Sequence, residues 1–359
     1  MKEVIIKKND AGQRLDKFLT KAFDLPQSLL YKSIRTKKIK RNRKRTEASV
    51  ILEEGDTLQL FLAPSFFGET SEDCPLGDIH VSLSIIYEDE NILLVNKPAG
   101  VSVHEDEDTK NNTLIMHIQA YLYQKGEYKP AEEQSFAPAL CNRIDRNTSG
   151  IVICAKTAEA LRIMNEKIKE RELDKFYLCV VHGIPREKSA TLYGYLLKDE
   201  KTKQVRVFDK NPPRGAKEIR TRYQVIAKKD NMALLEVELL TGRTHQIRAH
   251  LAHIGHPLLG DGKYGQNKED RQKGYKYQAL CSYRLRFSVR TVVFCPILMA
   301  GSFPFPKRKS TLPKSFSHNL NKRRKEPDSF LLLFVHLILK SGARGQRQKG
   351  IQSVKLLVQ

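Results

Sequence analysis

Hydrophobic residues recur at helical spacing near the start of the chain. Leu15, Phe18 and Leu19 are spaced i, i+3 and i+4, so they fall on one face of a helix. A second helix is expected to begin at Ser28, whose side chain can cap its first turn. The pattern therefore predicts two consecutive short helices at the N-terminal end.

Short strands are expected after these helices. Leu58, Leu60 and Leu62 alternate along the chain, as residues on the buried face of a strand do. We interpret residues 1–62 as one compact helix-helix-strand module. Residues 63–78 mix Pro, Gly, Ser and acidic residues, which is typical of a linker.

Residues 79–290 alternate between apolar runs and amphipathic segments. Thr157 begins an amphipathic helix, and a short helix is expected at residues 246–254, where Gly255 ends it. Strands are expected at residues 84–98, 150–156, 175–183 and 232–240. This mixture predicts a larger domain and places the whole chain in the α+β class.

The charge of the chain points to a polyanionic partner. Its 359 residues are 40% hydrophobic, enough for a packed core, and carry a formal net charge of +22 with a pI of about 9.7. Such an excess favours nucleic acid first and an anionic membrane surface second.

Nine basic residues and no acidic residue lie between positions 28 and 45. Their mutual repulsion would be relieved by phosphate groups, so Lys32, Arg35 and Lys38 are candidate RNA-binding residues. The alternative interpretation is a solvated helix face followed by a charged turn.

The last segment, residues 291–359, has no clear period and holds thirteen Lys or Arg against two acidic residues. We expect a basic, aperiodic tail, and one hypothesis is that it is not native, for example the product of a shifted reading frame. Its apolar run, residues 330–339, is too short to span a bilayer as a helix. We therefore expect a cytoplasmic protein without a membrane segment, and only this tail supports a membrane-surface protein.

Several chemistries lack their sequence signatures. The six cysteines include no CxxC pair and no zinc-finger spacing. No Walker motif, GxGxxG, HExxH or GxSxG occurs. We therefore expect neither a metal nor a small-molecule cofactor.

An aspartate flanked by arginines precedes the apolar strand at residues 150–156. Asp145 lies between Arg143 and Arg146, and these neighbours are expected to hold its carboxylate ionised and oriented. The alternative interpretation is a salt bridge in an ordinary loop.

Two further segments carry candidate chemistry. Arg243 and Arg248 lie with two histidines at the start of the helix expected at 246–254, where donors suit phosphate or carboxylate oxygens. The alternative is a polar loop capped by Thr244. Tyr177 lies at the start of another expected strand. The alternative interpretation of this residue is an ordinary half-buried tyrosine of a strand.

At these residues the chain resembles the RluA family of pseudouridine synthases. The family motif HRLDxxTSG reads NRIDRNTSG here, and KPAG stands at residues 97–100. The motif KxYxAxVxG corresponds to residues 175–183, and GRTHQIRxHxxxxGHPxxGDxxYG runs from residue 242 to residue 265. The resemblance implies a pseudouridine synthase fold, a mixed, mainly antiparallel sheet with flanking helices.

The first 62 residues resemble the αL-type RNA-binding motif, with its RLDKFL start, basic helix and EGD turn. Together the two resemblances imply an RNA-modifying enzyme that acts without a cofactor. Ribosomal RNA of the large subunit is favoured over transfer RNA as the partner, and a monomer is expected. The competing function is a non-catalytic RNA-binding or ribosome-assembly factor.

The resemblance also implies roles for individual side chains. Asp145 acts at C1′ of a flipped uridine, either by attacking it or by taking a proton from C2′. Arg248 pairs with this carboxylate, and Tyr177 stacks on the uracil and could take the C5 proton. The substrate-binding residues are Arg143, which fills the vacated space in the RNA stack, Ile247, which packs on the uracil or beneath Asp145, and Arg243. Asp261 is expected to be structural, because it follows Gly260 in a turn.

Overall fold

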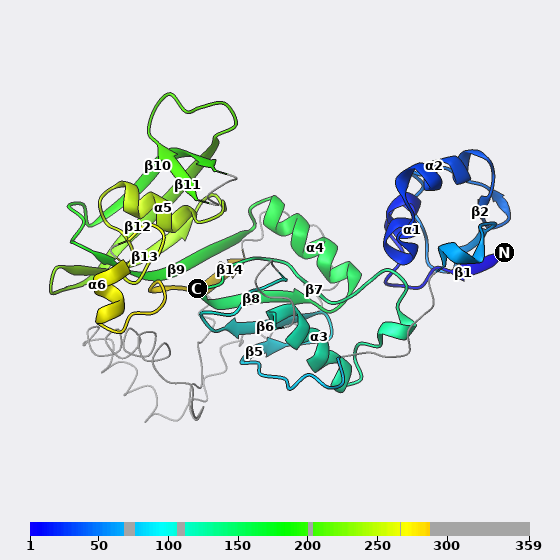
Figure 1. Ribbon diagram of the computed structural model, residues 1–359, viewed down its shortest axis with the longest axis horizontal. Helices are drawn as coiled ribbons and strands as arrows, with labels where there is room; N and C mark the ends of the chain where they lie inside the picture. Colours follow the sequence, from blue (N-terminus) through cyan, green and yellow to red (C-terminus); the bar gives the residue numbers. More distant parts are fainter. Residues whose placement is uncertain (68–75, 106–111, 200–203, 266, 288–359) are drawn as a thin grey trace, which may run out of the picture.

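The computed structural model describes residues 1–67, 76–105, 112–199, 204–265 and 267–287. The tail expected at residues 291–359 lies outside the described residues, and so do residues 68–75, half of the linker expected at 63–78. Figure 1 shows a small N-terminal unit on one side and a larger body built on a long sheet on the other.

The N-terminal unit has its own sheet, with strand order β1-β4-β2-β3, and its own apolar core. Leu15, Phe18 and Leu19 are completely buried, as their spacing predicts. The elements are β1 (Lys2–Ile5), α1 (Leu15–Phe23), α2 (Gln27–Arg35), β2 (Ile39–Arg41), β3 (Lys44–Arg45), β4 (Thr57–Leu60) and the 3-10 turn η1 (Pro64–Phe66).

Two local expectations for this unit are wrong. Helix α2 begins at Gln27 and is preceded by Pro26, so Ser28 is already inside the helix and is not its cap. The fixed φ of proline, here −56°, is compatible with a helix start, which explains why the helix begins directly after it. Strand β4 ends at Leu60, so Leu62 lies beyond the strand and only borders the core.

The larger body is built on one sheet, in which β11-β10-β12-β13-β9-β14-β8-β6-β5 lie side by side and β7 pairs with β8. Every pairing is antiparallel except that of β14 with β8, so the α+β class and the mixed, mainly antiparallel sheet are confirmed. The strands are β5 (Ile85–Glu88), β6 (Ile92–Lys97), β7 (Ala139–Leu140), β8 (Ser149–Ala155), β9 (Leu173–His182), β10 (Ser189–Lys198), β11 (Val205–Phe208), β12 (Lys217–Lys229), β13 (Met232–Leu239) and β14 (Leu280–Phe287).

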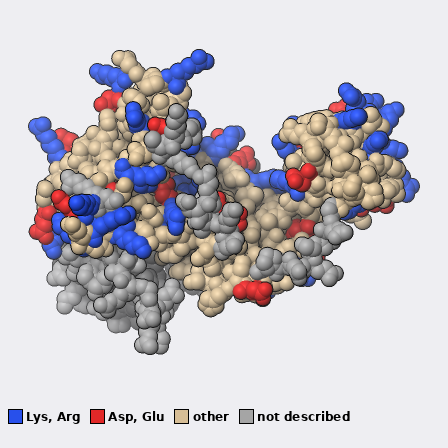
Figure 2. Space-filling view, in the orientation of Figure 1, with Lys and Arg blue, Asp and Glu red and all other residues tan. Residues whose placement is uncertain are grey.

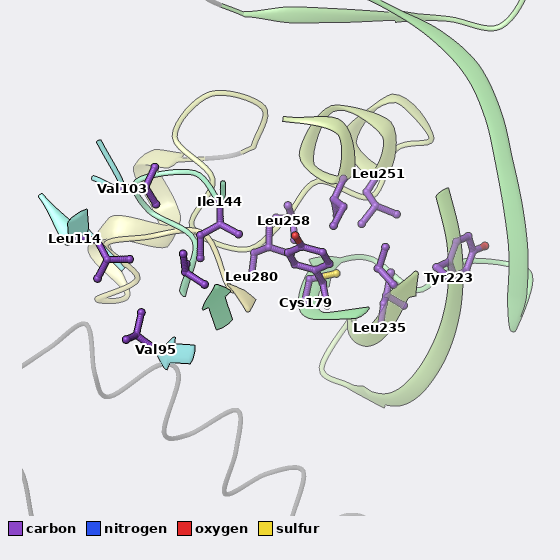
Figure 3. Close-up of a cluster of buried hydrophobic side chains, with 14 of the residues drawn as sticks. Val95, Val103, Leu114, Ile144, Cys179, Tyr223, Leu235, Leu251, Leu258 and Leu280 are labelled. Carbon is purple, nitrogen blue, oxygen red and sulfur yellow. The ribbon is translucent and has the colours of Figure 1, made fainter. Parts of the chain in front are cut away.

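Helices flank this sheet. Helix α4 begins where predicted, because the Thr157 side chain accepts a hydrogen bond from the Ala160 amide, and its Met164 is buried. The main core joins α3 and α5 to the strands, and Figure 3 shows its side chains in a row from Leu114 at one end to Tyr223 at the other. The helices are α3 (Leu114–Gln124), the 3-10 turn η2 (Pro130–Glu132), α4 (Ala158–Lys169), α5 (Gln246–His253) and α6 (Asn267–Gln272).

The two parts of the chain contact each other through polar groups. Asp10 accepts hydrogen bonds from the backbone and hydroxyl of Ser135, at 3.1 and 2.6 Å. Arg162, on α4, donates to the Ala11 carbonyl at 2.8 Å. The N-terminal unit is therefore attached beside α4.

The parallel pair β8–β14 joins the two halves of the sheet over only two residue pairs, Ser149–Cys281 and Gly150–Ser282. The loop that precedes β8 therefore stands where the strands diverge. Gly150 has φ +113°, and a Cβ built on it would lie 2.1 Å from the Ser282 carbonyl oxygen. Only glycine fits at position 150, where β8 pairs with β14.

We expect Gly150→Ala to prevent stable folding. Backbone strain alone costs about 1–3 kcal/mol, and the overlap with Ser282 adds to it. Thermal unfolding by circular dichroism is the measurement. The matched control is Gly126→Ala, which is also at positive φ but has nothing within 4 Å of the added Cβ. Equal melting temperatures for the two variants would contradict the steric account.

Candidate active site

An open pocket of about 690 Å³ lies beside the joint between β8 and β14. It is lined by the loop before β8, by the start of α5 and by strand β9. Six of the predicted site residues line it: Arg143, Asp145, Tyr177, Arg243, Ile247 and Arg248. The other three, Lys32, Arg35 and Lys38, are exposed on the N-terminal unit and do not line this pocket.

Hydrogen bonds from two residues hold the loop that carries Asp145. Its backbone makes a turn in which the Thr148 amide donates to the Asp145 carbonyl at 3.0 Å. The completely buried Lys97 donates to the carbonyls of Pro98, Val101 and Arg146 at 2.8–2.9 Å. The lysine of the KPAG segment thus joins two loops around the site, a role that sequence reasoning did not assign.

Asp145 is paired with an arginine distant in sequence. Arg248 Nη1 donates to Asp145 Oδ2 at 2.8 Å, and the two residues are 103 positions apart. The expectation that the flanking arginines hold the carboxylate is wrong for the described residues, since Arg146 instead donates to the Gly100 carbonyl and Arg143 is exposed. Neighbours in a tight turn project in different directions, whereas α5 aims Arg248 into the loop.

A second carboxylate holds Arg248 in place. Asp261 is completely buried and binds the guanidinium through two bonds, at 2.7 Å to Nε and 2.9 Å to Nη2. Burial acts to raise the pKa of Asp261, but the hydrogen bond and charge of Arg248 outweigh it and the pKa ends below its ordinary value. Asp261 does lie in a turn, as expected, and the missed feature is its contact with Arg248.

The pKa of Arg248 responds to the same contacts. Burial acts to lower this pKa, but Asp261 and Asp145 outweigh burial and raise it above the ordinary value of an arginine. The guanidinium therefore stays charged, and its hydrogen bond orients Asp145.

His245 lies near the same oxygen of Asp145 that Arg248 contacts. Its Nε2 lies 3.8 Å from Asp145 Oδ2, and its Nδ1 lies 2.9 Å from the Tyr264 hydroxyl. The residue has φ +55° and stands at the N-cap of α5, so the alternative of a loop capped by Thr244 is wrong. Burial lowers the pKa of His245 to about 4, so the imidazole is neutral at neutral pH.

Tyr177 and Ile247 form the apolar part of the pocket. They are 6% and 4% exposed, so Tyr177 is more buried than the alternative of a half-buried strand tyrosine implies. Burial raises the pKa of Tyr177, and its phenol keeps its proton at neutral pH. A neutral phenol is a poor proton acceptor.

Asn142 stands where the family motif has histidine. It is buried, and its Oδ1 accepts a hydrogen bond from the Ile153 amide of β8 at 2.8 Å. The side chain is hydrogen-bonded to the backbone of β8. This departure from the motif therefore leaves the charged groups of the pocket in place.

The described residues contain no group of three or more His, Cys, Asp or Glu that could hold a metal ion. Among the same residues, we find no helix with the length and apolar character that a membrane crossing requires.

The sequence comparisons agree on one family of proteins. Residues 91–253 match the family model described as RNA pseudouridylate synthase. The chain is 33% identical, over 277 residues, to the ribosomal large subunit pseudouridine synthase C of Vibrio parahaemolyticus, covering 76% of this chain and 82% of the relative. It is 32% identical to the Escherichia coli protein of the same name, covering 76% and 82%. Among solved structures, human RNA pseudouridylate synthase domain containing 1 has 23% identity and a TM-score of 0.48, covering 61% of this chain and 82% of that one.

Proposed function

The chain belongs to the RNA pseudouridylate synthase family, and from this premise we propose that it isomerises specific uridines of large-subunit ribosomal RNA, with Asp145 as the catalytic carboxylate. The observation that carries the proposal is the 2.8 Å contact between Asp145 and Arg248 inside a pocket of about 690 Å³. A monomer in the cytoplasm, where ribosomal RNA is modified, is part of the same proposal.

The reaction breaks the bond between C1′ and N1 of uridine and forms one between C1′ and C5. The C5 proton leaves to solvent and N1 takes up a proton from solvent, and no electron or group donor is needed, so the atoms balance without a cofactor. The carboxylate of Asp145 either attacks C1′ or takes the C2′ proton. Its side chain is 26% exposed, so a substrate can reach it from the pocket.

The target uridine must leave the RNA stack before Asp145 can reach it, at a cost of a few kcal/mol. The buried faces of Tyr177 and Ile247 offer the everted base an apolar surface. Arg143 and Arg243 are exposed at the pocket mouth. There they can fill the space that the everted base leaves in the RNA stack and can bind phosphate groups. This division supports Tyr177 and Ile247 as base contacts and the arginines as RNA contacts.

The N-terminal unit is proposed to bind RNA in the manner of the αL-type motif. Lys32, Arg35 and Lys38 are exposed, and Lys and Arg side chains gather along the outer edge of this unit in Figure 2. No hydrogen bond or ion pair within the described part of the chain involves these three side chains. Phosphates are the partners that such a surface fits.

Tritium release from ribosomal RNA labelled at C5 of uracil tests the proposed activity and separates it from non-catalytic RNA binding. The enzyme should release tritium in proportion to the pseudouridine formed, and RNA from cells lacking the gene should be the better substrate. RNA binding with no release from any ribosomal RNA would favour a non-catalytic factor instead.

Replacing Lys32, Arg35 and Lys38 together by Gln should weaken RNA binding and reduce its salt dependence. Each lost phosphate contact removes about 0.7–0.9 from the slope of log K against log salt, so the slope should fall by about 2–3. Filter binding over a salt series measures it. The control removes the same charge at the exposed Lys217, Lys228 and Lys229, and equal slopes for both triple variants would argue against the N-terminal surface.

A further inference from the structure

One cation of the pocket has no role in the mechanism described above. Lys175 lies on β9 two residues before Tyr177, so the two side chains point to the same face of the sheet. Both residues line the pocket that contains Asp145. They are separated by about 7 Å along the strand, a distance that a lysine side chain can span.

Lys175 is partly buried and has no partner of opposite charge among the described residues. Across the sheet it faces Leu239 on β13 and Leu285 on β14. No hydrogen bond or ion pair to its ammonium group occurs within the described residues, and burial lowers its pKa. Such a charge costs folding free energy, so its presence points to an anion that arrives with the substrate.

The substrate offers two kinds of anion. Phosphates stay near the mouth of the pocket, where the exposed Arg143 and Arg243 already stand. Lys175 is more buried than either and lies beside the tyrosine proposed to contact the base. When the bond from C1′ to N1 breaks, its electron pair stays on the uracil and spreads over N1, O2 and O4. This charge appears whether Asp145 attacks C1′ or takes the C2′ proton.

We propose that Lys175 is a further catalytic residue, whose ammonium group binds a carbonyl oxygen of the everted uracil and stabilises its negative charge between cleavage and re-formation of the glycosidic bond. The proposal rests on the proposed function. A donor aimed at charge that develops in the transition state acts on the chemical step more than on binding. The electron pair returns to C1′ through C5, so no other reactant is consumed.

The test is Lys175→Met, which keeps the length of the side chain and removes its charge, followed by single-turnover tritium release from RNA labelled at C5. We expect the rate at saturating enzyme to fall about 100- to 1000-fold. The dissociation constant for RNA should stay within about threefold, and Lys175→Arg should recover part of the rate. Because an unpaired, partly buried charge is lost, the melting temperature should be equal or higher. Lys228→Met, on the exposed end of β12, is the matched control and should behave as wild type.

Three outcomes would overturn the proposal: an unchanged rate, weaker binding with an unchanged rate, or a lower melting temperature with a rate that Lys175→Arg does not recover. Weaker binding with an unchanged rate would indicate that Lys175 binds a phosphate. A lower melting temperature without recovery of the rate would indicate that Lys175 stabilises the fold. Asp145→Asn is measured in parallel. If the wild type releases tritium and Asp145→Asn does not, an active Lys175→Met variant refutes this inference alone.

Discussion

Asp145→Asn should lose turnover by at least about 10⁴-fold, the upper end of what a single acid–base group contributes, while binding RNA as well as the wild type does. The amide has the size of the carboxylate, and its oxygen can still accept the hydrogen bond from Arg248. It cannot attack C1′ or take a proton from C2′. Tritium release measures turnover, and filter binding measures affinity.

The fold should survive this change because Arg248 keeps both of its bonds to Asp261. The melting temperature of Asp145→Asn should therefore lie close to that of the wild type. Asp78→Ala, at an exposed site outside the pocket, controls for the loss of one negative charge. Product formation by Asp145→Asn at more than a few per cent of the wild-type rate would remove Asp145 from its proposed role.

Arg248→Met should both inactivate and destabilise the enzyme. The substitution leaves the carboxylate of Asp261, which is 0% exposed, without its cation. Breaking a buried pair from one side costs about 3–5 kcal/mol, which corresponds to a fall of about 6–20 °C in melting temperature for a domain of this size. Thermal unfolding and tritium release measure the two effects.

The double variant Arg248→Met, Asp261→Asn separates stability from activity. It removes the unpaired charge while the amide oxygen can still accept hydrogen bonds from the backbone of Lys263 and Tyr264. We expect it to regain much of the lost stability and none of the activity, since Asp145 remains without its cation. A double variant that regains turnover would show that Arg248 matters only for the fold.

The spacing of apolar residues predicted the helices and strands of the scaffold, because the burial of one face of an element requires apolar residues at regular positions. The helix after Thr157, the strand at 150–156 and the core residue Phe18 follow this rule. The first residues of the helices were predicted less well from the sequence. Ser28 and Thr244 both have capping side chains, yet the helices begin after Pro26 and His245, because backbone conformation decides where a helix starts.

By itself, the sequence determined which segments supply the lining of the pocket, since Asp145, Tyr177 and Arg248 lie in motifs that can be read directly from the chain. Only the tertiary structure decided how they are paired. It joined Asp145 to Arg248 rather than to its neighbours, placed Asp261 behind that arginine, and left Lys175 inside the pocket. The physical reason is that an ion pair depends on a separation of a few ångströms, and only the fold sets this separation for residues distant in sequence.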